Sequence, residues 1–395
     1  MRASIYFIQF LKDDAASVGG GGIGTLISLL CPLLESFGHE VTVYQCADRP
    51  FDVRWGRTRV VGVPGYPGRG RSNERVVQGL RDRAGRDAGS GDRLEIFAAD
   101  FFSVRNANPF AICVQNGISW DADIRLLTQR RVYHTAWGEK LFRYRCQLRG
   151  LRRFETCRNR VAVDLFFLNW YRSFRGPQVP GRIFYNPNPA PEAAWDPERE
   201  RRHEPGRPLR VIFARRFFPE KGTRLVATVF AELLRLRPAV RVTLAGEGPD
   251  LEFFERAFAG DPRVTITSYQ PQDALAVHRE HDVAIVPSVC GEATCLSVLE
   301  AMSAGCAVVA TSMGGMITQV LDGHNGVLCD ATAESLLAPL VRLVDDGAWR
   351  SLMQRRGWEV SQATYGMARW RDRWRTIIRT VADPGACART SREEC

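Results

Sequence analysis

The sequence predicts an α/β protein made of two parallel-sheet domains, and three observations lead to this prediction. Short β-rich runs alternate with helix-compatible stretches along most of the chain, as they do when crossover helices join parallel strands. A segment rich in proline and charge, residues 187–208, divides this alternation into two series. The chain has 395 residues, which is enough for two or three domains that each bury a core.

The composition excludes several classes of protein. Apolar residues make up 45% of the chain and charged residues 25%, which is ordinary for folded proteins and argues against collagen, long disorder and a membrane bundle. The net charge of +10 attracts anionic partners at long range. Eleven cysteines without a C-x-x-C pair cannot all be bridged within the chain, so we expect free thiols in a reducing compartment.

The first residues, MRASIYFIQFLKDD, lack a small-residue cleavage site, so we interpret them as a first strand rather than a signal peptide. No run approaches the roughly 20 apolar residues that span a bilayer. We therefore expect a cytoplasmic protein, with peripheral contact on the inner face of the membrane as an option.

In the first half, one helix and four strands can be placed. The helix covers residues 24–37, in which Ile27, Leu30 and Leu34 keep helical spacing. The strands cover residues 4–10, 41–45, 94–98 and 110–114. Residues 55–92 show no pattern that can be interpreted.

In the second half, five apolar strands are each followed by turn residues and a helix-compatible stretch. They cover residues 209–214, 240–245, 264–267, 283–287 and 307–311. A doubly wound sheet binds its ligand beyond the carboxyl ends of its strands. We therefore look for chemistry at Arg215 and Arg216 and in residues 246–248, 288–292 and 311–315.

The strongest motif, PSVCGEATCLSVLEAMSAGCAVVATSMGG, covers residues 287–315. It predicts a strand, a tight loop and a helix from Cys295 to Ala304. The backbone N–H groups of Ala293, Thr294 and Cys295 would meet a diphosphate at the positive end of that helix.

Two carboxylates accompany this helix. Glu292 precedes it and could accept hydrogen bonds from sugar hydroxyls, and Glu300 follows eight residues later. Taken alone, the pair favours a helix-capping Glu292 and a solvated Glu300, because two glutamates at a given spacing are common.

The segment resembles the donor-site signature of retaining glycosyltransferases of family 4 with the GT-B fold. That signature is E-x7-E, then A-M-A-x-G and a strand of the type P-V-V-A-T; here Glu292 and Glu300 precede A-M-S-A-G and A-V-V-A-T. The resemblance implies two Rossmann-like domains facing a cleft and a nucleotide-diphosphate sugar as donor, with no metal and no other cofactor. It also implies that Glu292 holds the hydroxyls of the sugar and Glu300 the ribose. Cys295 stands where the family often has glycine.

Two basic residues follow the first strand of the second half. In ARRFFPEKG, Arg215 and Lys221 could neutralise one departing diphosphate, and the family shows the same R…K-G arrangement. A solvated basic turn is the alternative. Gly246 and Gly248, in LAGEGPDLE, resemble the turn at which the family lets backbone approach the nucleotide, although glycines often serve a turn alone.

In the first half, Gly19 to Gly24 formally contain G-x-G-x-x-G, but Lys12 to Val18 separate them from the strand, which disfavours a nicotinamide site. The stretch resembles the flexible glycine loop of the family, so Gly20 and Gly21 are candidates for contact with the donor phosphate.

The predicted strand 110–114 is followed by QNGISWD, in which Asn116 stands where relatives carry a histidine that contacts the transferred sugar. His134 is a conceivable substitute, although a lone histidine beside aromatic residues is more often structural. Asp121 and Asp123 are candidates for contact with the acceptor, although residues of a surface loop are the more common interpretation.

Positive charge gathers in one stretch of the first half. From Arg125 to Arg160 there are ten arginines and one lysine, against Glu139 and Glu155. Aromatic residues interleave at helical spacing, which favours basic amphipathic helices that suit an anionic lipid surface or a phosphorylated acceptor. A solvated arginine-rich face is the alternative, and we expect no nucleic acid because no recognised module is present.

We therefore predict domains at residues 1–186 and 209–364, a linker at 187–208 and a frayed tail at 383–395. The family resemblance implies that a last helix, residues 365–382, returns to the first domain. It also implies a glycosyltransferase that acts on a sugar, lipid-linked or glycan acceptor in polysaccharide, glycolipid or glycoconjugate synthesis. The alternatives are a nucleotide-sugar epimerase or hydrolase and a non-catalytic protein that binds a membrane or nucleic acid. No catalytic base is identified.

Overall fold

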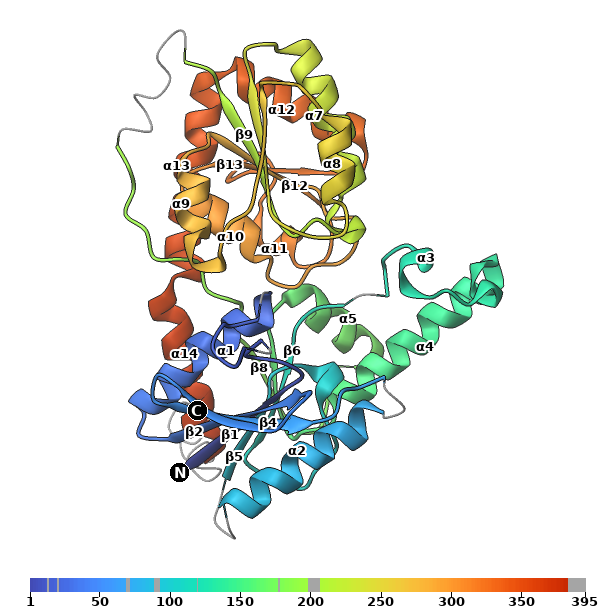
Figure 1. Cartoon of the computed structure of the whole chain (residues 1–395), viewed down its shortest axis with the longest axis vertical. Coiled ribbons are helices and arrows are strands. Elements are labelled where there is room, and N and C mark those ends of the chain that lie inside the picture. The colour runs from blue at the N-terminus through green and yellow to red at the C-terminus, as the bar shows by residue number, and fades with distance from the viewer. Residues whose placement is uncertain are drawn as a thin grey trace.

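The computed structural model describes residues 1–12, 14–19, 21–68, 72–88, 93–118, 120–176, 178–197 and 207–382. Two sheets, one in each half of the chain, form two domains that lie one above the other in Figure 1. Helices pack on both faces of each sheet, so the α/β fold predicted from the sequence is confirmed.

In the described part of the chain, the first sheet has eight strands in the order β3-β4-β2-β1-β5-β6-β7-β8. All neighbours are parallel except β3 and β4, which form an antiparallel pair. The strands are β1 (Arg2–Phe7), β2 (Glu40–Ala47), β3 (Phe51–Trp55), β4 (Thr58–Pro64), β5 (Arg93–Phe97), β6 (Ala111–Gln115), β7 (Asn159–Ala162) and β8 (Arg182–Tyr185).

The helices of this half are α1 (Gly22–Ser36), α2 (Asn73–Ala88), η1 (Asp100–Phe102), α3 (Ile124–Leu127), η2 (Arg131–His134), α4 (Ala136–Phe154) and α5 (Leu165–Arg175). Helix α1 covers one face of the sheet, and α2 and η1 cover the other. The inner end of α4 packs with α5 in a further apolar cluster.

Two predictions for this half need correction. The first strand ends at Phe7 rather than at residue 10, because the side-chain oxygen of Gln45 accepts the backbone N–H groups of Phe10 and Leu11 at 3.0 and 2.7 Å. Residues 55–92, which showed no interpretable pattern, contain β4 and α2.

The second sheet, as far as the structure describes it, has six parallel strands in the order β11-β10-β9-β12-β13-β14. They are β9 (Arg210–Ala214), β10 (Arg241–Ala245), β11 (Val264–Thr267), β12 (Val283–Val286), β13 (Ala307–Thr311) and β14 (Val327–Cys329). The five predicted strands agree with the structure to within one residue at each end, whereas β14 was not anticipated.

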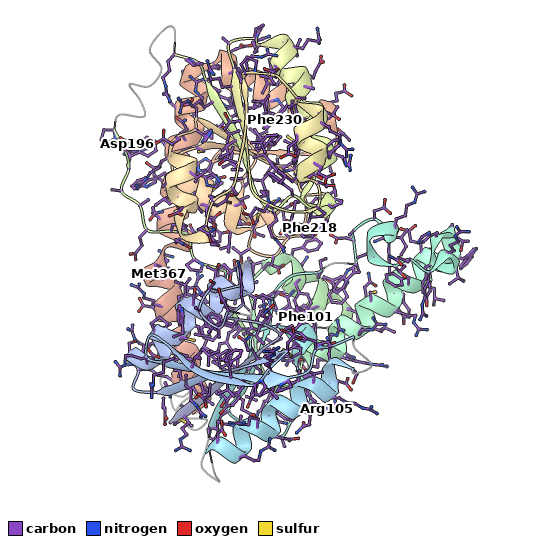
Figure 2. All side chains as sticks on the ribbon, viewed as in Figure 1. Phe101, Arg105, Asp196, Phe218, Phe230 and Met367 are labelled. Atoms are coloured by element: carbon purple, nitrogen blue, oxygen red, sulfur yellow. The ribbon has the colours of Figure 1, made fainter. Side chains whose placement is uncertain are left out.

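The helices of this half are η3 (Pro219–Lys221), α7 (Thr223–Leu236), α8 (Leu251–Ala257), η4 (Pro271–Asp273), α9 (Ala274–Arg279), α10 (Leu296–Ser303), α11 (Met316–Gln319), α12 (Ala333–Asp345), α13 (Gly347–Tyr365) and α14 (Met367–Ala382). Helices α7, α8 and α12 share one apolar cluster, and α10 and α11 share the other. Side chains fill the space between the helices and the sheet, with Phe230 of α7 fully buried (Figure 2).

The chain crosses twice between the domains. After α13, helix α14 packs against the core of the first domain, in which Trp370 and Trp374 are buried. The outgoing segment runs beside this return, because the N–H of Ala190 donates to the carbonyl of Tyr365 at 2.8 Å. The indole of Trp358 donates to the carbonyl of Ala193 at 2.9 Å.

None of the helices formed by the described residues combines the length and the apolarity needed to cross a bilayer.

Candidate active site

The candidate site lies where the carboxyl ends of the two sheets meet. A Cβ atom added at Gly117, which follows β6, would lie 3.0 Å from the Cβ atom of Ala293 in the second domain. The Thr294 hydroxyl donates to the carbonyl of Val163, which follows β7. Loops at the predicted ligand-binding edge of the second sheet therefore contact the corresponding edge of the first.

Arg215, Lys221 and Glu292 come together in this region. Nη2 of Arg215 and Nζ of Lys221 each lie 2.7 Å from the same oxygen, Oε1 of Glu292. The hydroxyl of Ser288 donates to this oxygen at 2.7 Å and accepts a hydrogen bond from Arg215. One carboxylate oxygen thus collects three donors from two loops.

Local backbone geometry places Lys221 in this cluster. Gly222, which follows it, has φ 80° and begins α7. A Cβ atom at this position would lie 1.9 Å from the carbonyl oxygen of Pro287. Only glycine permits both the left-handed conformation and the close approach of the two loops.

The cluster carries an excess of positive charge. Burial would raise the pKa of Glu292, but the charges of Arg215 and Lys221 and the hydrogen bonds to the carboxylate hold it at about 2. The carboxylate is therefore ionised at neutral pH and opposes two cations. Arg215 is only 6% exposed, so little solvent screens the remaining positive charge. Such a place is suited to an anion.

Glu300 lies on α10 beside this cluster but outside it. Burial raises the pKa of Glu300 to about 7, although the positive charge of Arg215 acts in the opposite direction. Burial raises the pKa of Tyr269, and the negative charge of the Glu300 carboxylate contributes in the same direction. Within the described residues the Glu300 carboxyl has no hydrogen-bond partner, so its oxygens are available to accept hydrogen bonds from a ligand.

Hydrogen bonds within the protein already use part of the predicted anion site at the start of α10. The N–H of Cys295 donates to Oε1 of Gln319 at 2.8 Å, and Nε2 of Gln319 donates to the Cys295 carbonyl at 3.0 Å. This N–H is therefore not free for a diphosphate, contrary to the expectation. The Thr294 hydroxyl, besides binding Val163, accepts the N–H of Asn188 at 3.2 Å, so it joins the domains.

Gly246 and Gly248 hold the loop that carries Arg215. Their φ angles are 154° and 149°. A Cβ atom at Gly246 would lie 1.9 Å from the carbonyl oxygen of Arg215, and one at Gly248 would lie 2.5 Å from that of Phe217. The close packing against this loop is enough to explain why both positions are glycine. Their contact with a nucleotide stays a prediction.

The glycine loop of the first domain reaches the start of α10. Gly20 lies outside the described residues, and Gly21, with φ 115°, precedes α1. A Cβ atom added at Gly22 would lie 3.7 Å from Cδ1 of Leu296. The loop therefore ends at the junction of the domains.

The amide of Asn116 is engaged within the first domain. Its Nδ2 donates to the carbonyl of Ala98 at 2.6 Å and more weakly to that of Val114 at 3.4 Å. His134, the conceivable substitute, lies in η2, where its Nε2 is 2.9 Å from the carbonyl oxygen of Thr128. Asp123 caps α3 by accepting the N–H of Arg125 at 2.8 Å.

Asp121 brings a carboxyl group of the first domain to the loop of Glu292. A Cβ atom added at Gly291 would lie 2.6 Å from Oδ2 of Asp121. Burial raises the pKa of Asp121, and the negative charge of Glu292 contributes in the same direction. Its Oδ1 is buried without a hydrogen-bond partner among the described residues.

Sequence reasoning missed two residues at this junction, Gln319 and Asp164. Ser288 lies in the stretch 288–292 where chemistry was expected, but its hydrogen bonds to Arg215 and Glu292 were not anticipated. Gln319 contacts Cys295, which is 24 positions away in the sequence, so no spacing reveals it. Asp164 accepts the N–H of Phe167 at 2.6 Å as the cap of α5, and only this capping role has a sequence signal. A Cβ atom added at Gly315, in the second domain, would lie 3.0 Å from the Cβ atom of Asp164.

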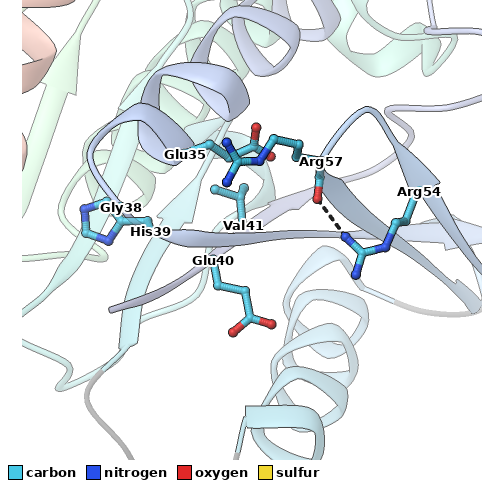
Figure 3. A pocket seen from close by; sticks show the side chains of 7 residues that line it. All are labelled: Glu35, Gly38, His39, Glu40, Val41, Arg54 and Arg57. Carbon is cyan, nitrogen blue, oxygen red and sulfur yellow. Dashed lines mark hydrogen bonds between the residues drawn. The ribbon is translucent and has the colours of Figure 1, made fainter.

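Within the described residues, no three His, Cys, Asp or Glu side chains are grouped as metal ligands would be. A surface hollow of about 370 Å³ lies elsewhere, between the end of α1, the start of β2 and the β3–β4 turn (Figure 3). There Arg54 donates to the carbonyl of Arg57 at 3.1 Å. This hollow is at the amino end of β2, so it takes no part in the site.

Part of the chain is similar in sequence to known proteins. Residues 208–346 match the family described as glycosyl transferases group 1. The chain is 33% identical over 154 residues to sulfoquinovosyl transferase SQD2 of Arabidopsis thaliana, covering 38% of this chain and 29% of that one. It is 34% identical over 176 residues to D-inositol 3-phosphate glycosyltransferase of Corynebacterium efficiens, covering 40% of each. The matches thus span less than half the length of these relatives.

Solved structures resemble the whole chain. Sucrose-phosphate synthase from Thermosynechococcus elongatus superposes with a TM-score of 0.72 at 16% identity, covering 96% of this chain and 98% of that one. WaaG, a glycosyltransferase involved in lipopolysaccharide biosynthesis, has a TM-score of 0.69 at 14% identity, covering 95% and 99%. At these identities the likeness concerns the fold. The chain therefore has the GT-B fold, and its residues 208–346 form a domain of the glycosyl transferases group 1 family.

Proposed function

We propose that this protein is a retaining glycosyltransferase of family 4. It moves a sugar from a nucleotide-diphosphate sugar to an acceptor hydroxyl, and it needs no metal. The group 1 domain and the relatives that are named glycosyltransferases support the reaction class. The observation that carries the proposal is the convergence of Arg215 and Lys221 on one oxygen of Glu292.

In this reaction the bond from the anomeric carbon to the diphosphate breaks, and a bond to the acceptor oxygen forms on the same face of the sugar. Negative charge develops on the departing diphosphate, where Arg215 and Lys221 stabilise it from fixed positions. The acceptor proton passes to the departing phosphate oxygen, so a separate base is not required.

The carboxylates orient the donor. An arriving diphosphate competes with Glu292 for the two cations, and the freed carboxylate then accepts hydrogen bonds from the hydroxyls of the sugar. Glu300 accepts hydrogen bonds from the ribose, a role that its unpartnered and half-buried carboxyl permits in the described structure.

The acceptor is a glycan or a lipid-linked sugar in this proposal. Relatives include proteins named lipopolysaccharide 1,2-N-acetylglucosaminetransferase of Salmonella typhimurium and glycogen synthase of Mycobacterium tuberculosis. Their names support synthesis of polysaccharides, glycolipids or other glycoconjugates. Asp121, which reaches the site from the first domain, is the candidate contact for the acceptor.

The test begins with a thermal-shift screen of UDP-, GDP- and dTDP-sugars. A ligand at 100 times its dissociation constant adds about 2.7 kcal/mol to the free energy of unfolding. The donor that stabilises the protein is then assayed for nucleotide release with and without glycan and lipid acceptors, and NMR of the first product gives the anomeric configuration.

Release that depends on an acceptor, with retention, supports the proposal. Equal release without acceptor would indicate a hydrolase, and binding without any release would indicate a non-catalytic protein. Either result overturns the transferase assignment.

A further inference from the structure

One part of the first domain extends away from the sheet. We call it the basic arm and define it as α3, η2 and α4 with the residues between them, 124–154. Figure 1 shows α4 running outward from the first domain, with α3 at its outer end. At the inner end of α4, Gly150, Leu151 and Phe154 are buried in the domain, whereas most of the outer turns are exposed.

The outer part of the basic arm exposes large apolar side chains. Trp137 is 84% exposed, Leu141 53% and Tyr144 51%, and Val132 in the preceding η2 is 68% exposed. Trp137, Leu141 and Tyr144 follow the i, i+4, i+7 spacing, which places them on one face of α4. Four of the ten large apolar side chains that are exposed in the described residues therefore lie in this short segment, which makes it a patch rather than a scatter.

Cations flank this apolar face. Nζ of Lys140 lies 5.7 Å from the ring centre of Trp137, and Arg145 and Arg149 are exposed on the same helix. The one acidic residue in the sequence of α4 is Glu139, and its Oε1 is bound by Nε of Arg143 at 2.9 Å. The face is thus apolar along its middle and positive at its borders.

We infer that the outer face of the basic arm docks on the surface of an anionic lipid bilayer. Trp137, Leu141 and Tyr144 enter the boundary between headgroups and acyl chains, where indole and phenol rings are stable. Lys140, Arg145 and Arg149 contact lipid phosphates from either side of the apolar stripe.

Other occupants fit this face less well. A nucleic acid would find positive charge, but Leu141 and Val132 neither stack on bases nor form hydrogen bonds with them. A second copy of the chain would bring two positively charged borders together in a symmetric contact, and they repel one another. The combination of aliphatic, aromatic and basic side chains on a projecting helix favours lipid.

The position of the arm connects this surface with the candidate site. The segment between β6 and α3 includes Gly117, which faces Ala293, and Asp121, which faces Gly291. Docking would hold this junction close to the bilayer. The inference stands on the arm itself and does not depend on the proposed reaction.

The experiment is sedimentation of the full chain with vesicles of phosphatidylcholine, with and without phosphatidylglycerol. We expect binding to the anionic vesicles alone and a decrease with added salt. The double variant Trp137→Ser/Leu141→Ser should lower the partition coefficient about tenfold or more, because two apolar contacts are lost. The double variant Arg145→Glu/Arg149→Glu should lower it by roughly tenfold.

Matched controls separate the arm from general effects. Leu321→Ser removes a side chain of the second domain that is 57% exposed. Arg369→Glu/Arg379→Glu reverses two exposed arginines of α14 and changes the net charge by the same amount as the arm variant. Both controls should bind anionic vesicles as the unmodified chain does, and circular dichroism checks that every variant is folded.

Three results would overturn the inference: equal binding to neutral and anionic vesicles, equal loss in the control variants, and no loss in the arm variants. A shift from dimer to monomer on Trp137→Ser/Leu141→Ser in vesicle-free sedimentation would assign the face to a second copy instead. Brominated lipid gives a direct check, because it should quench the fluorescence of the unmodified chain more than that of Trp137→Phe.

Discussion

Nζ of Lys221 lies 2.7 Å from Oε1 of Glu292, although the two residues are 71 positions apart in the sequence. Arg215 contacts the same oxygen, so both cations are held in place before any ligand arrives. This arrangement has two consequences for ligand binding. The cations need little reorganisation when negative charge develops between them, and an anion must compete with Glu292 for their hydrogen bonds.

The first prediction concerns transition-state stabilisation. Lys221→Ala should lower kcat/KM for a nucleotide-sugar donor by a factor that corresponds to on the order of 2–4 kcal/mol, as expected when one fixed donor to developing charge is removed. Steady-state nucleotide release measures this. The control is Arg216→Ala, because the exposed guanidinium of Arg216 stacks on Phe218, 5.3 Å from the ring centre. An equal loss of kcat/KM in the two variants would mean that catalysis depends on the positive charge of the loop as a whole and not on the position of Lys221.

The second prediction follows from the competition at Glu292. Glu292→Gln keeps the shape of the side chain but removes the charge that opposes Arg215 and Lys221. The variant should be less stable by on the order of 3 kcal/mol, because buried cations lose their partner. It should also bind inorganic pyrophosphate at least about tenfold more tightly, since no carboxylate competes.

Calorimetry with pyrophosphate and urea unfolding measure these two effects. Glu247→Gln is the control, because it makes the same charge change at an exposed position in the loop after β10. Weaker pyrophosphate binding by Glu292→Gln than by the unmodified chain would contradict the competition argument.

Much of the second domain could be predicted from the sequence, for a simple physical reason. Strands β12 and β13 are buried at every position, so apart from Thr311 they read as continuous runs of valine, isoleucine and alanine bounded by polar turns. Helix α2 escaped prediction because its sequence, NERVVQGLRDRAGRDA, is mostly polar and offers only a narrow apolar stripe for burial.

The site was predictable only in part. The motifs named Arg215, Lys221, Glu292 and Glu300, and the structure joins the first three directly. The contact between Cys295 and Gln319 could not be predicted, because it depends on how two loops pack rather than on local spacing. The same holds for the sharing of Thr294 between the domains.

The third prediction is a pH dependence of donor affinity. Because the pKa of Glu300 is raised to about 7, half of the carboxyl groups are protonated near neutral pH. A ribose hydroxyl donates best to the ionised form, so binding should strengthen as pH rises through this value. Between pH 6 and pH 8 the dissociation constant of a nucleotide sugar should fall about tenfold.

A nucleotide sugar suits this titration because its diphosphate is esterified at both ends and has no proton that titrates near neutrality, unlike a terminal phosphate. Glu300→Gln serves as the control and should show a flat profile. A flat profile for the unmodified chain as well would remove Glu300 from the binding site.

The last prediction concerns Asp164, whose Oδ1 caps α5 and whose Oδ2 is buried without a hydrogen-bond partner in the described structure. Burial raises its pKa from an ordinary value of 3.8 to about 6. The folded protein therefore keeps this proton where the unfolded chain loses it, and stability falls as pH rises from about 4 to about 6. Asp164→Asn keeps the capping oxygen and removes the charge.

The difference in unfolding free energy between Asp164→Asn and the unmodified chain should therefore shift in favour of the variant by on the order of 1–3 kcal/mol between pH 4 and pH 8. Any constant effect of the amide cancels in this comparison. Asp100 and Glu300, whose pKa values burial raises to about 7, are present in both proteins and cancel as well. Urea unfolding at the two pH values measures the shift. A difference that stays constant with pH would show that folding does not raise the pKa of Asp164, and that water or a polar group solvates Oδ2 at the junction of the domains.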